Sequence, residues 1–233
     1  MIGTSRPLCV IPARIGSKRL PRKNIMTLHG QPMLAYTVEA AFDSGLFEQV
    51  IVSTEDEEIA DVARQFGAVA HKRPEELAGD LVSATDVCLE VADVLEASGR
   101  SFESLVCLQP SSPLRHGEDV RAAWERYVAA GADYLVSVTL IDPHYFHWAV
   151  HETDEGWGMY FGEQFLMERP LLPPVYRPNG AIKIGRIALL RKTRNFFGKG
   201  LEVSFTPEER SIHVAEQFDF DLAHHLMARS REV

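Results

Sequence analysis

The sequence is poor in cysteine, and its cysteines do not suggest a disulfide or a metal site. Only three occur in 233 residues, at Cys9, Cys88 and Cys107, and each lies in an apolar stretch. There is no CxxC pair and no cysteine–histidine spacing typical of a zinc site. We therefore exclude a disulfide-stapled scaffold and predict three reduced core residues in a cytoplasmic protein.

Long hydrophobic runs are also missing. No apolar stretch approaches the roughly 18 residues that indicate a membrane span, although hydrophobic residues make up 45% of the chain. The first seven residues lack the long apolar centre of a secretory signal. The sequence thus predicts no membrane association.

Positive charge is scarce but concentrated. The formal net charge is −9, which argues against a general nucleic-acid-binding protein. Five of the 24 basic residues nevertheless fall within ten positions, at Arg14, Lys18, Arg19, Arg22 and Lys23. A local cluster of basic residues in a protein of negative net charge is suited to binding a small polyanion rather than a long polymer.

Apolar runs and amphipathic segments alternate along the chain. Strands are expected at 8–11, 50–53, 105–108, 134–140 and 181–187, and helices at 33–44, 57–66, 84–97, 118–130 and 221–230. Strands that are continuous apolar runs are covered by helices on both faces. The sequence therefore predicts an α/β fold: one three-layer α/β/α domain over 1–233 around a mostly parallel, Rossmann-like sheet.

The basic loop 14–24 directly follows the first expected strand, and the segments 54–56 and 109–115 follow two others. Ligands of such sheets bind beyond the carboxyl ends of the strands, so we expect the three segments to converge on one crevice. The loop has neither a Walker spacing nor a dinucleotide fingerprint. Backbone amides around Gly16 and Ser17, together with fixed cations, predict a triphosphate site. The alternative is a solvated basic turn.

The pattern breaks over 141–177, where aromatic residues are dense and Pro170-Leu171-Leu172-Pro173-Pro174 excludes a regular helix or a central strand. We interpret this segment as an arm or hairpin that leaves the sheet. An exposed apolar arm needs a partner surface, which predicts a homodimer contact. The alternative is that the arm packs onto its own domain.

Five motifs occur in the same order as in a known family. They are Ile11-Pro12-Ala13-Arg14-x-Gly16-Ser17-Lys18-x-x-Pro21-x-Lys23-Asn24, Val52-Ser53-Thr54-x-Asp56, Arg73-Pro74-x-Glu76-Leu77-Ala78-x-Asp80, Leu108-Gln109-Pro110-Ser111-Ser112-Pro113-Leu114-Arg115 and Arg177-Pro178-Asn179-Gly180-Ala181-Ile182. In these motifs the chain resembles the acylneuraminate cytidylyltransferases (CMP-sialic acid synthetases), which include legionaminate and pseudaminate cytidylyltransferases. The resemblance covers about residues 8–190. It implies a nucleotidyltransferase fold and a reaction in which CTP and an acidic nine-carbon keto sugar give a CMP-sugar and pyrophosphate, with Mg²⁺ as cofactor.

The resemblance also implies how the nucleotide is bound. Arg14, Ser17 and Lys18 would hold the β- and γ-phosphates. Lys23 and Asn24 would contact the α-phosphate, so they and Arg14 are the expected catalytic residues. The other expected nucleotide-binding residues are Ala13 and Gly16 in the same loop, and Arg73, Asp80 and Ser83 on the cytidine side.

On the sugar side, the resemblance implies that Gln109 forms a hydrogen bond with the sugar and that Arg169 meets the sugar carboxylate, often from a partner subunit. Arg177 and Asn179 are the further expected sugar-binding residues. Simpler interpretations stay open for some positions: Arg73 as a helix cap, Arg115 as a structural pair, and Asn179-Gly180 as a turn.

Two departures from the family pattern affect the metal and the sugar site. The family usually has Asp-x-Asp near the C-terminus, where this chain has His213 and Ala215. The family also often has a tyrosine at the position that Lys183 occupies in this chain. Asp219 and Asp221 follow shortly after and are the candidate Mg²⁺ ligands, although Asp221 is equally a helix cap. Two other functions therefore stay open: a nucleotide-binding homologue with weak or lost catalysis, and a nucleotidyltransferase for another acidic sugar.

Overall fold

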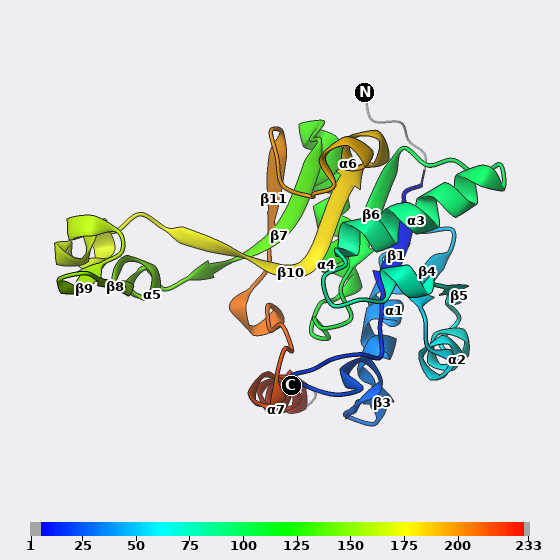
Figure 1. Cartoon of the computed structure of the whole chain (residues 1–233), viewed down its shortest axis with the longest axis horizontal. Helices are drawn as coiled ribbons and strands as arrows, with labels where there is room; N and C mark the ends of the chain where they lie inside the picture. The colour runs from blue at the N-terminus through cyan, green and yellow to red at the C-terminus, as the bar shows by residue number, and fades with distance from the viewer. Residues whose placement is uncertain (1–5, 231–233) are drawn as a thin grey trace.

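In residues 6–230, which the computed structural model describes, seven strands form one sheet in the order β11-β7-β10-β6-β1-β4-β5 (Figure 1). The strands are β1 (Leu8–Pro12), β4 (Val50–Thr54), β5 (Val69–Lys72), β6 (Ser104–Leu108), β7 (Tyr134–Ile141), β10 (Val175–Arg186) and β11 (Leu201–Phe205). Only β10 runs antiparallel to its neighbours β6 and β7, whereas the other pairs are parallel. The prediction of a mostly parallel α/β sheet is confirmed.

Helices cover both faces of the sheet. They are α1 (Met33–Asp43), α2 (Glu57–Gln65), α3 (Ala84–Ala97), α4 (Gly117–Ala130), α6 (Ile187–Thr193) and α7 (Gln217–Ser230). Within β1, Cys9 and Ile11 pack into one buried cluster with α1 and α4, while Leu8 and Val10 pack into another with α3 and α6. Successive strand side chains point to opposite faces, so a continuous apolar strand supplies both cores of a three-layer domain. None of the described helices meets the length and apolarity needed to cross a membrane.

Several elements differ from the sequence prediction. The helix α6 lies where the sequence predicts no helix, and β10 begins at Val175 rather than at 181. The strands β5 and β11 were not predicted, because both are short edge strands with few buried positions. The helix α7 begins at Gln217 rather than at 221. The carboxylate of Asp219 accepts hydrogen bonds from the backbone N–H groups of Ala215 and Glu216, at 2.8 and 3.0 Å, which stabilises this earlier start.

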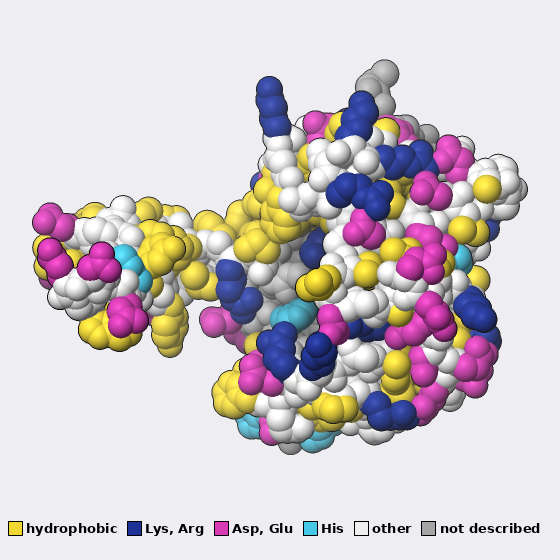
Figure 2. Space-filling view, viewed as in Figure 1, with side chains coloured by type: hydrophobic (Ala, Val, Ile, Leu, Met, Phe, Trp, Pro, Cys, Tyr) yellow, Lys and Arg dark blue, Asp and Glu magenta, His cyan; other side chains and the backbone are white. Residues whose placement is uncertain are grey.

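The chain leaves the sheet after Ile141 and returns at Val175, close to the predicted limits of the arm. The arm contains α5 (Pro143–His147), the hairpin β8 (Val150–Thr153) and β9 (Gly156–Met159), and the 3-10 turns η3 (Gly162–Leu166) and η4 (Arg169–Leu171). It projects away from the main body as a separate lobe (Figures 1 and 2), which disagrees with packing onto its own domain. Tyr145, Trp157 and Leu166 stay largely exposed on it.

Candidate active site

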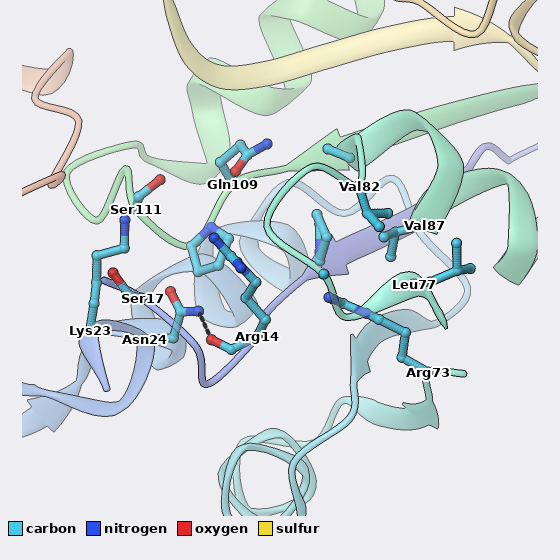
Figure 3. Close-up of a pocket in the computed structure, with 14 residues that line it drawn as sticks. Arg14, Ser17, Lys23, Asn24, Arg73, Leu77, Val82, Val87, Gln109 and Ser111 are labelled. Carbon is cyan, nitrogen blue, oxygen red and sulfur yellow. Dashed lines mark hydrogen bonds between the residues drawn. The ribbon is translucent and has the colours of Figure 1, made fainter. Parts of the chain in front are cut away.

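The basic loop follows β1 and is anchored at both ends. The N–H of Ala13 donates to the carbonyl of Ser53 at the end of β4, at 3.0 Å. The side-chain nitrogen of Asn24, which is buried, donates to the carbonyl of Arg14 at 2.8 Å (Figure 3). This bond ties the start of the loop to η1 (Lys23–Ile25), where the loop ends. These two bonds fix both ends of the loop against the sheet, which favours a binding site over a solvated turn.

A cavity of about 230 Å³ opens beyond the carboxyl ends of β1, β5 and β6, whereas the segment 54–56 after β4 does not line it. Of the residues expected at the site, it brings together Arg14, Ser17, Lys23, Asn24, Arg73 and Gln109. An adjoining hollow of about 500 Å³ shares Arg14 and Ser17 with this cavity and is also lined by Gly16, Lys18 and Asp80. A Cβ atom added at Gly16 would meet nothing within 4 Å, so the loop backbone is open to an approaching ligand.

Lys23 presents its ammonium group between the loop and the C-terminal segment. Its Nζ donates to the carbonyl of Val214 at 2.8 Å and lies toward Ser111 (Figure 3). Loss of hydration lowers the pKa of Lys23, and the neighbouring cations Arg19 and Arg14 lower it further. A cation in such surroundings gains more from an incoming phosphate than an exposed lysine does.

Arg73 forms the floor of the cavity and is 3% exposed. Its guanidinium donates to the carbonyl and the hydroxyl of Ser53, and lies 3.6 Å from the carboxylate of Glu55. Burial lowers the pKa of Arg73, and the charge of Glu55 acts in the opposite direction. Arg73 therefore ties the cavity floor to β4 rather than capping a helix.

Gln109 follows β6 and faces the loop across the cavity (Figure 3). Behind it, the fully buried Arg115 donates to the carbonyls of Gln109 and Ala181, at 3.2 and 3.0 Å. Burial lowers the pKa of Arg115 to about 10. Arg115 thus has a structural role, because it holds the turn that carries Gln109 against β10.

The other expected sugar-binding residues do not line this cavity. Asn179 is buried: its side-chain oxygen accepts from Ser137 and from the N–H of Ala181, and its nitrogen donates to Ser211. These bonds make Asn179 part of the scaffold. Arg177 is exposed on β10.

Arg169 lies in the arm, where it pairs with Asp142 at 2.8 Å and lines a separate cavity of about 720 Å³ between the arm and the main body. On the nucleotide side, Ser83 caps α3 by accepting the N–H of Asp86. Within one chain, then, the structure assembles the nucleotide side of the predicted site and leaves most of the sugar side apart.

The predicted metal ligands do not fit a shared ion. Asp219 and Asp221 both lie within α7, where residues two apart point to different sides of the helix. The carboxylate of Asp219 accepts the N–H groups that precede the helix, and the carboxylate of Asp221 accepts a hydrogen bond from Gln217 at 2.8 Å. Among residues 6–230, no group of three or more His, Cys, Asp or Glu side chains is placed to hold a metal. Because α7 starts before both residues, the two carboxylates diverge.

His213, which replaces the expected aspartate, is a residue that the sequence did not assign to the site. Its Nδ1 lies 3.2 Å from the hydroxyl of Ser111, which lines the cavity. Although the residue as a whole is exposed, loss of hydration around its imidazole lowers the pKa to about 4, and the charge of Lys23 is the next cause. The ring is therefore neutral near pH 7. Ser111 and Leu77 belong to motifs quoted above, which were the available signal, whereas the apolar lining residues Val82 and Val87 had none.

Several known proteins are similar to this chain in sequence. A family model described as cytidylyltransferase matches residues 8–146. Pseudaminic acid cytidylyltransferase from Campylobacter jejuni is 37% identical over 133 residues, which are 57% of this chain and 57% of that protein. CMP-N,N'-diacetyllegionaminic acid synthase from Legionella pneumophila is 32% identical over 97% of this chain and 98% of that protein. The match thus spans little more than half of the first relative and nearly all of the second.

A solved structure has the same fold. It is CMP:2-keto-3-deoxy-manno-octonic acid synthetase complexed with CTP, which matches with a TM-score of 0.74 over 97% of this chain and 100% of that chain. The two sequences are 18% identical, so this likeness concerns the fold alone.

Proposed function

The chain belongs to the cytidylyltransferase family, and from that premise we propose that it transfers the CMP group of CTP to a sialic-acid-like nonulosonate. The hydroxyl oxygen of the sugar forms a bond to the α-phosphorus of CTP, and the bond to the bridging oxygen of the β-phosphate breaks. Pyrophosphate leaves, and the hydroxyl proton is released. The products are a CMP-sugar and pyrophosphate.

One observation carries this proposal: Arg14, Ser17, Lys23 and Asn24 line one cavity together with Gln109 on the opposite side. Transfer of a phosphoryl-type group depends mainly on positioning and on neutralising charge. The loop supplies cations and hydrogen-bond donors for the triphosphate, and Gln109 supplies an amide for the sugar. The apolar side chains of Leu77, Val82 and Val87 form the other wall, beside Arg73, where the cytosine ring would lie.

The test is the release of pyrophosphate from CTP with N-acetylneuraminic, legionaminic and pseudaminic acids in turn. We expect pyrophosphate release with at least one of these acids. We also expect faster release from CTP than from ATP, GTP or UTP. CTP binding in calorimetry without release from any sugar would instead support a nucleotide-binding homologue. Release only with a shorter keto acid, such as an eight-carbon sugar, would support a nucleotidyltransferase for another acidic sugar.

Mg²⁺ stays part of the proposal as an ion that arrives with the triphosphate, because Mg²⁺ commonly binds through substrate phosphates and retained water. We route no catalytic step through it, since no group of three or more His, Cys, Asp or Glu side chains among residues 6–230 is placed to hold it. What the chain itself contributes to phosphate neutralisation comes from Arg14, Lys18 and Lys23.

Restoring two carboxylates should make nucleotide binding depend more strongly on the metal. We expect the double variant H213D/A215D to bind CTP about 10-fold or more tightly in Mg²⁺ than in EDTA, and the unaltered protein to show a smaller ratio. Calorimetry under both conditions measures the two ratios. The matched control is H213N/A215N, which adds polar side chains without charge. Equal metal dependence in all three proteins would contradict the prediction.

We also propose that the arm makes a homodimer contact, which is supported by its exposed apolar side chains Trp157 and Leu166. The variant W157R/L166D is expected to shift the protein from dimer to monomer in light scattering after size exclusion, because buried charges oppose association. The control is V94D on α3, at an exposed valine of the main body. A monomeric unaltered protein, or an unchanged mass for the arm variant, would contradict this contact.

A cytoplasmic location is the last part of the proposal. It is supported by Cys9, Cys88 and Cys107, which are free and buried in the structure, since free cysteines persist in reducing compartments.

A further inference from the structure

One carboxylate holds both cations that are expected to bind the end of the triphosphate. Oδ1 of Asp80 lies 2.5 Å from Nη1 of Arg14, and Oδ2 lies 2.5 Å from Nζ of Lys18. Hydrogen bonds from Lys18 and Arg14 lower the pKa of Asp80. With its two oxygens, this carboxylate occupies the same pair of donors that a terminal phosphate would use.

The turn that carries Asp80 lies at the rim of the site. Gly79 lines both the nucleotide cavity and the adjoining hollow, and Val82 lines the cavity. Between them, the side chain of Leu81 is fully exposed, so packing of this side chain does not fix the turn. The two ion pairs of Asp80 therefore tie this turn to the basic loop, across 66 positions of sequence from Arg14.

These ion pairs weaken the binding of every ligand that uses Arg14 and Lys18. An incoming phosphate must replace the carboxylate, and the carboxylate, being tethered, is always present at high effective concentration. When the bond between the α- and β-phosphates breaks, the pyrophosphate remaining on the same cations loses its link to the rest of the nucleotide. The tethered carboxylate then competes with a weaker ligand than it did before.

We propose that Asp80 is an internal counter-ion that the triphosphate displaces on binding and that in turn displaces pyrophosphate after the reaction. This inference rests on the proposed cytidylyltransferase function and adds a residue that governs the exchange of substrate and product. Both ion pairs are partly exposed, with side-chain exposures of 35% for Arg14, 39% for Asp80 and 83% for Lys18. Pairs of this kind are weak, so the competition permits CTP to bind.

The test compares D80N with the unaltered protein by calorimetry with CTP, pyrophosphate and CMP. We expect D80N to bind pyrophosphate and CTP about 5- to 10-fold more tightly, as loss of two weak ion pairs allows. CMP lacks the β- and γ-phosphates, so its affinity is expected to stay within about 2-fold, since it does not displace the carboxylate. The gain should shrink in 1 M NaCl, where screening extends over only about 3 Å.

The matched control is E57Q. Glu57 forms a similar exposed ion pair with Arg64 on α2, at 2.7 Å, but neither residue lines the nucleotide cavity or the adjoining hollow. We expect E57Q to leave all three affinities unchanged. Equal or weaker binding of pyrophosphate and CTP by D80N would overturn the inference, because Asp80 would then merely position the two cations. If the unaltered protein bound neither CTP nor pyrophosphate, the proposed function itself would fail.

Discussion

Replacing Lys23 with methionine is expected to lower kcat by about 100- to 1,000-fold, the usual effect of removing one preorganised donor to a developing negative charge. Lys23 is held in the crevice by its bond to the carbonyl of Val214, and burial among other cations already lowers its pKa. Methionine keeps the length and apolar character of the side chain but removes the charge. Pyrophosphate release at saturating CTP and sugar measures the effect.

The matched control for K23M is R22M, which removes a cation from the neighbouring position. Arg22 pairs with Glu58 and lines the adjoining hollow but not the cavity that Lys23 lines, so we expect less than a 3-fold change in kcat, because exposed ion pairs contribute about 0–1 kcal/mol. Similar losses for both variants would indicate that the loop acts only through its summed charge. Near-normal kcat for K23M would contradict the assignment of Lys23 to the α-phosphate.

Replacing Arg73 with methionine is expected to lower the free energy of unfolding by about 3 kcal/mol, because removing one partner leaves a buried charge uncompensated. Arg73 is 3% exposed, and its loss would leave the carbonyl of Ser53 without this donor and Glu55 without its cation. For a chain of this size the change corresponds to a fall in Tm of roughly 6–12 °C. Thermal unfolding at fixed pH and salt measures it.

Arg64 provides the control for this effect, since it is exposed on α2 and pairs with Glu57 and Asp61. R64M should change the free energy of unfolding by less than about 1 kcal/mol. In R73M, CTP should also raise Tm less than it does in the unaltered protein, because Arg73 forms the floor of the nucleotide cavity. A Tm for R73M equal to that of R64M would show that the buried charge of Arg73 does not stabilise the fold.

Much of the fold followed from local pattern. The apolar runs at β1, β4 and β6 and the helix α3 match their predicted positions within about one residue. The edge strands β5 and β11 were missed because most of their side chains are not buried, so they lack the strong apolar signal of a central strand. The start of α7 was missed because Asp219 stabilises it by accepting N–H groups of residues that precede the helix.

The candidate site likewise contains residues that the sequence predicts and residues whose role only the structure shows. The basic loop could be predicted, because its charges and glycine are neighbours in the sequence and follow a strand. Asn179 and Arg115 were ambiguous in the sequence, and the structure gives both a scaffold role through bonds to residues up to 66 positions away. Charge and motif do not reveal whether a polar side chain has its hydrogen bonds satisfied inside the protein.

The sequence by itself determined that this protein has an α/β sheet with a basic loop after its first strand, because strand periodicity and clustered charge are properties of neighbouring residues. Only the tertiary structure decided how each cation of that loop is used. Lys23 faces the crevice through a bond to Val214, 191 positions away, while Arg22 turns outward to Glu58. Arg14 and Lys18 share the carboxylate of Asp80. Such contacts arise when folding brings distant segments together at one edge of the sheet, and no local pattern specifies them.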